Sequence, residues 1–127
     1  MKPLKYTLIF IAIFDLILFS LSQFNTELFV SMSPQIHVTD GDYNYPRVAG
    51  FLILSLGVLR LYGGLFIKEK GAFIASIWSW VIELVWIIAF IMYGASTLEE
   101  SIMSLVLTPA FIIWSIIYYR KNFRTSN

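Results

Sequence analysis

Three ionisable residues lie within otherwise apolar stretches of the sequence and are the first candidates for chemistry. They are Asp15 in FIAIFDLILF, Arg60 in LSLGVLRLYG and Glu83 in SWVIELVWII. A charged side chain at the centre of a membrane span costs roughly 2.5–3.5 kcal/mol on insertion scales, so such residues pair with one another or face a water-filled cavity. We refer to Asp15, Arg60 and Glu83 as the charge network.

The depths of the three residues allow Arg60 to reach both acids. At about 1.5 Å per helical residue, Asp15 lies about 15 Å, Arg60 about 10 Å and Glu83 about 18 Å from the same end of the spans. A long arginine side chain can therefore bridge the two acids and hold three helices together. Two alternatives stay open: a proton or ion pathway through the acids, and an Arg60 side chain that extends to the lipid headgroups.

The composition indicates an integral membrane protein. Apolar residues make up 58% of the 127 residues and charged residues only 13%, and the mean hydropathy is +0.76, which is far too apolar for a soluble domain. The net charge of +1 offers no basic face to nucleic acid. The absence of cysteine excludes disulfides, thiolate metal sites and cysteine nucleophiles.

Four apolar runs are each long enough to cross about 30 Å of hydrocarbon as a helix. Because the runs are continuously apolar and lipid requires internal satisfaction of the backbone, we expect helices and not strands. The sequence predicts an all-α integral membrane protein, one four-transmembrane-helix bundle over residues 1–127, in which Pro109 bends the last helix or frees a carbonyl group. The predicted spans are 5–21, 46–67, 72–92 and 101–119.

Charged residues outside the spans predict the orientation. One side carries basic residues before the first span, between the second and third, and after the fourth, which the positive-inside rule assigns to the cytosol or an equivalent compartment such as the mitochondrial matrix. Both termini are expected on that side, opposite an acidic loop over residues 22–45. The loop contains His37 and Asp40-Gly41-Asp42, but the full calcium-loop pattern is absent and no metal site is predicted.

Small residues recur at regular spacing on the second and third spans. Such stripes let helix backbones approach closely in lipid. We interpret them either as the packing surface between these two spans or as a docking surface for another protein. The stripes consist of Gly50, Gly57 and Gly64 on the second span and Gly71, Ala75 and Ser79 on the third.

The stretch from PRVAGFLILSLGVLRLYGG to the end of the third span resembles the ergosterol biosynthetic protein 28 family of small four-span membrane proteins. The resemblance implies a non-catalytic scaffold that tethers sterol C-4 demethylation enzymes in the endoplasmic reticulum membrane. A divergent relative could serve another assembly, such as a respiratory-chain complex in the mitochondrial inner membrane. The positions that carry the resemblance are Arg47, Gly50, Arg60, Lys70, Trp78, Tyr93, Gly94 and Pro109.

The residues independently favour a protein that is not an enzyme. No nucleophile–base pair, metal cluster or phosphate-binding loop can be assembled from the sequence, and no cofactor is expected. The first hypothesis is a scaffold or accessory subunit whose partners are other integral membrane proteins and membrane lipids, sterol included. The second is a small carrier or channel that uses the charge network, and the third is an enzyme with a charged lipid- or sterol-binding pocket.

Overall fold

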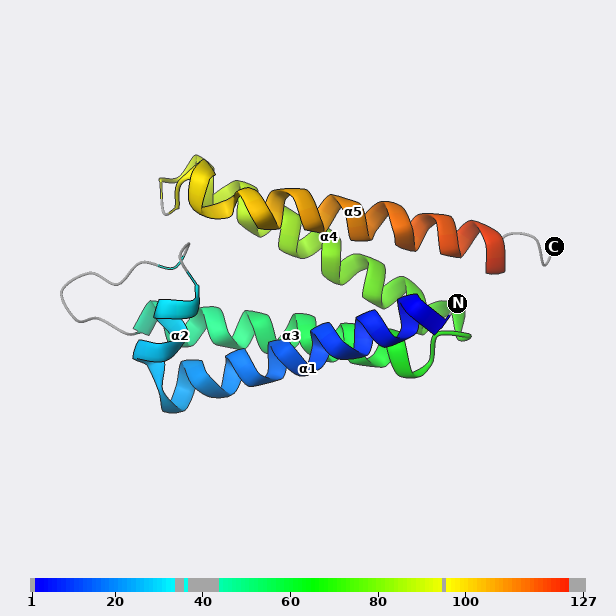
Figure 1. Cartoon of the computed structure of the whole chain (residues 1–127), viewed down its shortest axis with the longest axis horizontal. Coiled ribbons are helices and arrows are strands. Elements are labelled where there is room, and N and C mark those ends of the chain that lie inside the picture. Colours follow the sequence, from blue (N-terminus) through cyan, green and yellow to red (C-terminus); the bar gives the residue numbers. More distant parts are fainter. Residues whose placement is uncertain (1, 34–35, 37–43, 95, 124–127) are drawn as a thin grey trace.

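The computed structural model describes residues 2–33, 36, 44–94 and 96–123, and all regular structure in them is helical (Figure 1). Four of the helices are long, and one short helix follows the first of them. In chain order they are α1 (Lys2–Phe24), α2 (Thr26–Met32), α3 (Asn44–Leu65), α4 (Lys70–Met92) and α5 (Leu98–Asn122).

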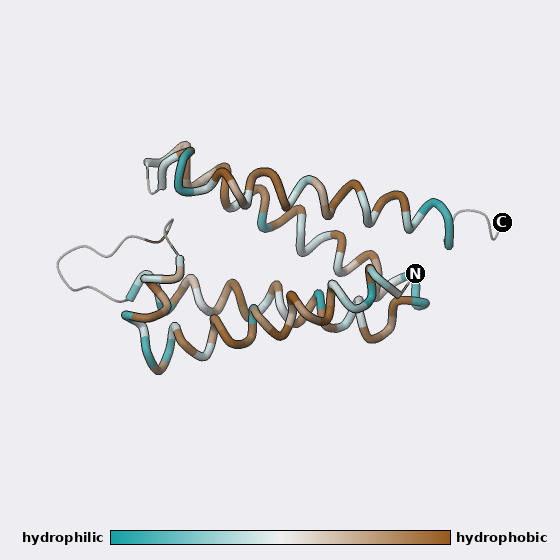
Figure 2. The backbone as a smooth tube through the Cα atoms, viewed as in Figure 1, coloured by the Kyte–Doolittle hydropathy of each residue, from teal (hydrophilic) through white to brown (hydrophobic). Residues whose placement is uncertain are grey.

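The four long helices make this an integral membrane protein. Each is long and apolar enough to cross a bilayer, with mean hydropathies of 2.1, 1.8, 2.1 and 1.9 in chain order. Apolar residues run along all four, as the colouring of Figure 2 shows. The predicted spans match these helices to within a few residues at each end, and α5 continues through Pro109 without a break.

The predicted acidic loop over residues 22–45 is wrong at its start. Helix α1 continues to Phe24, and α2 follows after Asn25, whose side chain accepts a hydrogen bond from the backbone N–H of Leu28 at 3.4 Å. Phe29 of α2 is fully buried against Ile36 and Ala49, which holds this short helix on the bundle. His37, Asp40 and Asp42 lie outside the described residues.

The helices form two pairs that meet at one end of the molecule. Helix α3 packs along α1 and also contacts α4, while α5 packs on α4 (Figure 1). At the end that holds the start of α1 and the end of α5, side chains from α1, α4, α5 and the turn after α3 share one core, and we call this the closed end. That core contains Leu4, Leu8, Ile67, Phe73, Trp80 and Tyr118.

Toward α2, the α1/α3 pair and the α4/α5 pair diverge, and we call this the open end (Figure 1). The start of α1, the α3–α4 turn and the last turn of α5 all lie at the closed end. The basic residues that predicted the orientation are therefore gathered at one end of the bundle. Within the described residues they are Lys2, Lys5, Lys68, Lys70, Arg120 and Lys121.

Candidate functional site

The structure brings the three residues of the charge network together, with Arg60 between the two acids. Arg60 is only 1% exposed; its Nη1 lies 2.8 Å from Asp15 Oδ2 and its Nη2 lies 3.0 Å from Glu83 Oε2. Its Nε donates to Ser79 Oγ at 3.1 Å. A single guanidinium thus joins α1, α3 and α4.

The flat face of the Arg60 guanidinium and the far side of Glu83 are also occupied. The guanidinium carbon lies 3.7 Å from the centre of the Trp80 ring, a cation–π contact, and Trp80 in turn stacks on Phe111 of α5 at 4.6 Å. The Thr108 hydroxyl of α5 donates to Glu83 Oε2 at 3.3 Å. All four long helices therefore contribute to the surroundings of the ion pairs.

The local sequence of α4 explains how several partners reach Arg60 from one helix. Residues three and four apart lie on the same face of a helix, so Ser79 and Trp80 share the face of Glu83. The sequence predicts only a small packing role for Ser79 and does not predict Trp80 or Thr108 as members of the network. Their spacing from Glu83 on α4 was the available signal for Trp80 and Ser79, whereas nothing in the sequence linked Thr108 of α5 to Glu83.

A glycine on α3 sets the distance between Asp15 and Arg60. A Cβ atom at Gly57 would lie 2.9 Å from the Cβ of Asp15, closer than side-chain carbons approach one another. Because Gly57 has no side chain, α1 can approach α3 one turn from Arg60. The close approach places the Asp15 carboxylate within reach of the guanidinium.

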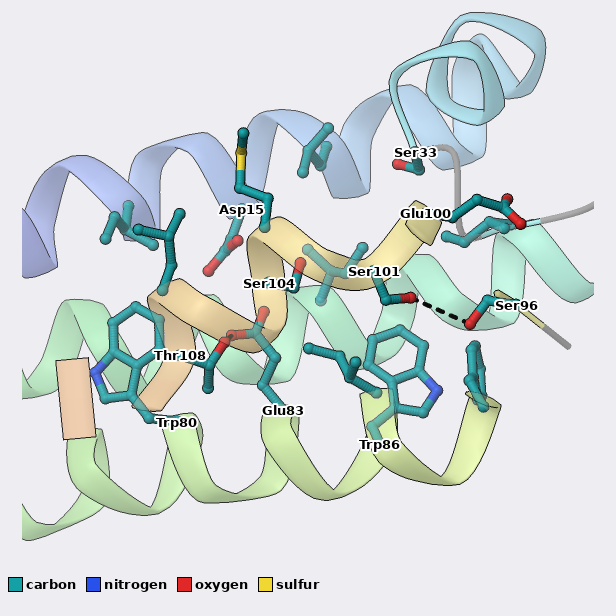
Figure 3. A pocket seen from close by; sticks show the side chains of 18 of the residues that line it. Asp15, Ser33, Trp80, Glu83, Trp86, Ser96, Glu100, Ser101, Ser104 and Thr108 are labelled. Carbon is teal, nitrogen blue, oxygen red and sulfur yellow. Dashed lines mark hydrogen bonds between the residues drawn. The ribbon is translucent and has the colours of Figure 1, made fainter. Parts of the chain in front are cut away.

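A cavity of about 740 Å³ extends from the charge network toward the open end, between the two helix pairs. Figure 3 shows the carboxylates of Asp15 and Glu83 pointing toward one another at one end of this cavity, with Thr108 beside Glu83. At the other end, Ser96 and Ser101 share a hydrogen bond of 3.2 Å between their hydroxyl groups. The cavity therefore has polar groups at both ends.

The small-residue stripes pack differently from the prediction. Gly50, Gly57 and Gly64 all face α1, where their nearest side-chain neighbours include Ser22, Asp15 and Ile9. They do not form the predicted packing surface between the second and third spans. Since α1 already covers these glycines, they offer no docking surface to another protein.

A different set of small residues packs α3 against α4. Gly63 approaches Ala72 and Ser76, so closely that a Cβ atom there would lie 2.5 Å from the Ser76 Cβ. Gly71 has no neighbour within 4 Å of such an atom, and Ala75 is only partly buried. The contacting stripe on α4 is therefore Ala72, Ser76 and Ser79, shifted one position from the predicted stripe at its first two residues.

The positions that carry the family resemblance are dispersed. The Arg47 carbonyl accepts a hydrogen bond from the Gln23 side chain at 3.0 Å, near the start of α3. Trp78 is 58% exposed on the outside of α4, and Tyr93 and Gly94 end that helix, Gly94 with a φ of +76° that suits glycine. Arg60 is the one member of this set that belongs to the charge network.

Comparisons with protein-family models, with curated proteins and with solved structures give no match to this chain. The resemblance to the ergosterol biosynthetic protein 28 family stays a prediction.

Proposed function

We propose that the protein is a non-catalytic membrane subunit that docks partner membrane proteins, as a scaffold or an accessory subunit. The observation that carries the proposal is the contrast between the polar contacts inside the bundle and the apolar side chains on its outside. Inside, the guanidinium of Arg60 is engaged with groups of the chain itself. Outside, every long helix presents large apolar side chains to its surroundings.

Two outward stripes illustrate such surfaces. On α4, Trp78, Ile82 and Val85 are 58%, 41% and 61% exposed. Residues at this spacing share one face of a helix, so they form a continuous apolar strip on which another membrane helix can pack. On α1, a second strip of the same kind is formed by Phe10, Ile13 and Ile17, which are 71%, 49% and 50% exposed.

Two assemblies are candidates for the partner membrane proteins. The family resemblance favours sterol C-4 demethylation enzymes of the endoplasmic reticulum, and the recruited alternative is a respiratory-chain or other large membrane complex of the mitochondrial inner membrane. The partners in both assemblies are integral membrane proteins surrounded by lipid, and in the first assembly this lipid includes sterol. Neither requires a cofactor or a catalytic residue in this chain.

Co-purification of the tagged full-length chain in a mild detergent, followed by quantitative mass spectrometry, tests the proposal. A scaffold or accessory subunit recovers a stoichiometric set of membrane proteins, and their identity distinguishes the two assemblies. Two triple alanine variants, one in each outward strip, serve as matched controls for each other. We expect one variant to lose the partners while both keep the melting temperature of the unaltered chain; recovery of the unaltered chain alone would contradict docking.

A carrier or channel is the second candidate, and the cavity is the observation that favours it. The cavity reaches the charge network from the open end, whereas a shared core fills the closed end. This one-sided access is what a carrier shows in one of its states. A carrier predicts flux in reconstituted vesicles that Glu83→Gln removes while partner recovery persists, and vesicles without flux would exclude it.

A further inference from the structure

The cavity between the helix pairs contains more acidic than basic groups. Its lining includes four carboxylates, and Arg60 is the one basic residue among the described residues that line it. A single guanidinium balances one negative charge, so its two ion pairs leave the charge network with an excess of one carboxylate when both are ionised. The four acids of the lining are Asp15, Glu83, Glu99 and Glu100.

Both acids of the charge network keep an oxygen available to the cavity. Arg60 and Thr108 bond to Oε2 of Glu83, and Arg60 bonds to Oδ2 of Asp15. Within the part of the chain that the structure describes, Glu83 Oε1 and Asp15 Oδ1 accept no hydrogen bond. The side chain of Glu83 is 25% exposed and that of Asp15 is 10% exposed, so a cation in the cavity can approach Glu83 without displacing Arg60.

The walls between the two polar ends of the cavity are apolar. Aliphatic and aromatic side chains from four helices face the space, which favours a ligand with an extended hydrocarbon or ring body. The volume of about 740 Å³ falls within the range of roughly 300–1,000 Å³ that small-ligand sites show. Members of these walls are Phe14, Leu18, Ile53, Trp86, Ile87 and Leu107.

The size and the lining of the cavity together favour a small amphiphile as the occupant. The volume is that of a small-ligand site, the walls are apolar, and polar groups lie toward both ends.

The excess carboxylate of the charge network selects the headgroup of that amphiphile. A phosphate group bound beside the ammonium would lie close to Asp15 and Glu83. It would face like charge there, and like charges at close range are costly in a medium of low dielectric constant. A headgroup that carries an amine without a phosphate meets no such repulsion.

We propose that this cavity binds a lipophilic amine, with its ammonium group against the free oxygens of Glu83 and Asp15 and its apolar body along the walls. Oriented hydrogen bonds from an ammonium to these oxygens would balance the excess carboxylate of the charge network. The site does not depend on the docking role proposed above, because its walls lie inside the bundle and the docking strips lie outside. A chain without partners would still bind the amine.

Three probes with the same twelve-carbon chain test the site on the full-length protein in a neutral maltoside detergent. Dodecylamine is cationic, dodecanol is neutral and dodecanoate is anionic at pH 7. Binding is measured by isothermal titration calorimetry and by the change in intrinsic tryptophan fluorescence, to which Trp80 and Trp86 of the cavity lining contribute among the four tryptophans of the chain. We expect dodecylamine to bind about tenfold or more tightly than dodecanol, and dodecanoate to bind most weakly.

Three variants locate the binding. Glu83→Gln keeps the size of the side chain and removes its charge, and we expect dodecylamine affinity to fall to that of dodecanol. Ser104→Phe places a ring in the cavity without changing an ionisable group, and it should abolish binding of every probe. Glu27→Gln, the same chemical change at an exposed acid of α2 that does not line the cavity, should leave all affinities unchanged.

The outcomes are decisive even if Glu83→Gln fails to fold, because the probe series and Ser104→Phe do not require it. Equal affinities for the three probes would overturn the amine site, and so would undiminished dodecylamine binding by Ser104→Phe. Phosphatidylethanolamine carries the same ammonium on a phospholipid and distinguishes the source of the ligand. If it binds as tightly as dodecylamine, the argument against a phosphate-bearing headgroup is wrong.

Discussion

At the scale of single residues, Arg60 can be buried because every part of its guanidinium group has a partner within the chain. A guanidinium that is 1% exposed within a membrane protein is stable when its donors and its flat face are engaged. Here two carboxylates, a hydroxyl group and an indole ring provide those contacts. The stabilisation belongs to the set and not to any one pair, because removal of one partner leaves the others with an uncompensated charge.

The first prediction concerns the coupling between Arg60 and Asp15. We expect Arg60→Ala to lower the free energy of unfolding by about 3–5 kcal/mol, because it leaves two buried carboxylates without their counter-ion. Asp15→Asn should cost less, since Glu83 still pairs with Arg60. The double variant should lose less than the sum of the single losses.

Unfolding by a denaturing detergent in mixed micelles measures these free energies. A matched control is Glu27→Gln, which alters an exposed acid of α2 and should leave the stability unchanged. Strictly additive losses for Arg60→Ala and Asp15→Asn would mean that the two residues do not interact.

At the scale of helices, small residues recur at heptad spacing on two of the long helices. On α3 they are Gly50, Gly57 and Gly64, which pack against α1. Helix α5 has a buried series at the same spacing, formed by Ser101, Thr108 and Ser115. Such stripes allow close approach where lipid removes the usual hydrophobic drive between helices.

The same helices show which features the sequence predicts and which it does not. Hydropathy was sufficient to predict the four spans, and the cost of a buried charge was sufficient to predict a network around Arg60. The helix that packs on each stripe was not predictable, because a heptad spacing suits any facing helix. Adjacent glycines such as Gly63 and Gly64 also lie about 100° apart around the helix axis, so each can face a different helix. Helix α2 was missed because seven residues are too few to show a periodicity, and Phe29 stabilises it through distant contacts.

The second prediction tests the close approach of α1 and α3. Gly57→Ala would place a methyl group 2.9 Å from the Asp15 Cβ, so α1 must shift, and we expect a loss of about 1–3 kcal/mol in the free energy of unfolding. Gly71→Ala is the matched control. It has open space within 4 Å, and alanine favours the helix by about 0.5–1 kcal/mol.

Detergent-induced unfolding and the melting temperature report both changes. The two variants differ by one methyl group each, so a difference between them reflects the site alone. Equal stabilities for Gly57→Ala and Gly71→Ala would contradict the close packing of α1 on α3.

At the scale of the whole molecule, the two ends of the bundle differ in charge and in packing. Among the described residues, the closed end carries Lys5, Lys68, Lys70, Arg120 and Lys121, with one acid, Glu69, around a shared apolar core. The described part of the open end carries Glu27, Glu99 and Glu100, with one basic residue, Arg47, and leads into the cavity. From the positive-inside rule we propose that the closed end faces the cytosol or the mitochondrial matrix and that the cavity is reached from the opposite half of the membrane.

The third prediction tests this orientation with single cysteines, because the natural sequence contains none and needs no background removal. Lys68→Cys and Lys121→Cys place a thiol at the closed end, and Glu27→Cys and Glu99→Cys place one at the open end. A membrane-impermeant maleimide is applied to sealed vesicles of known sidedness. The first two variants should react only from the cytosolic or matrix side and the last two only from the other side, since four spans return the chain to its starting side. Reaction of Lys68→Cys and Glu27→Cys from the same side would contradict the transmembrane arrangement. If all four variants react from the side opposite to the one expected, the four spans stand, but the orientation is reversed and the cavity is reached from the other side.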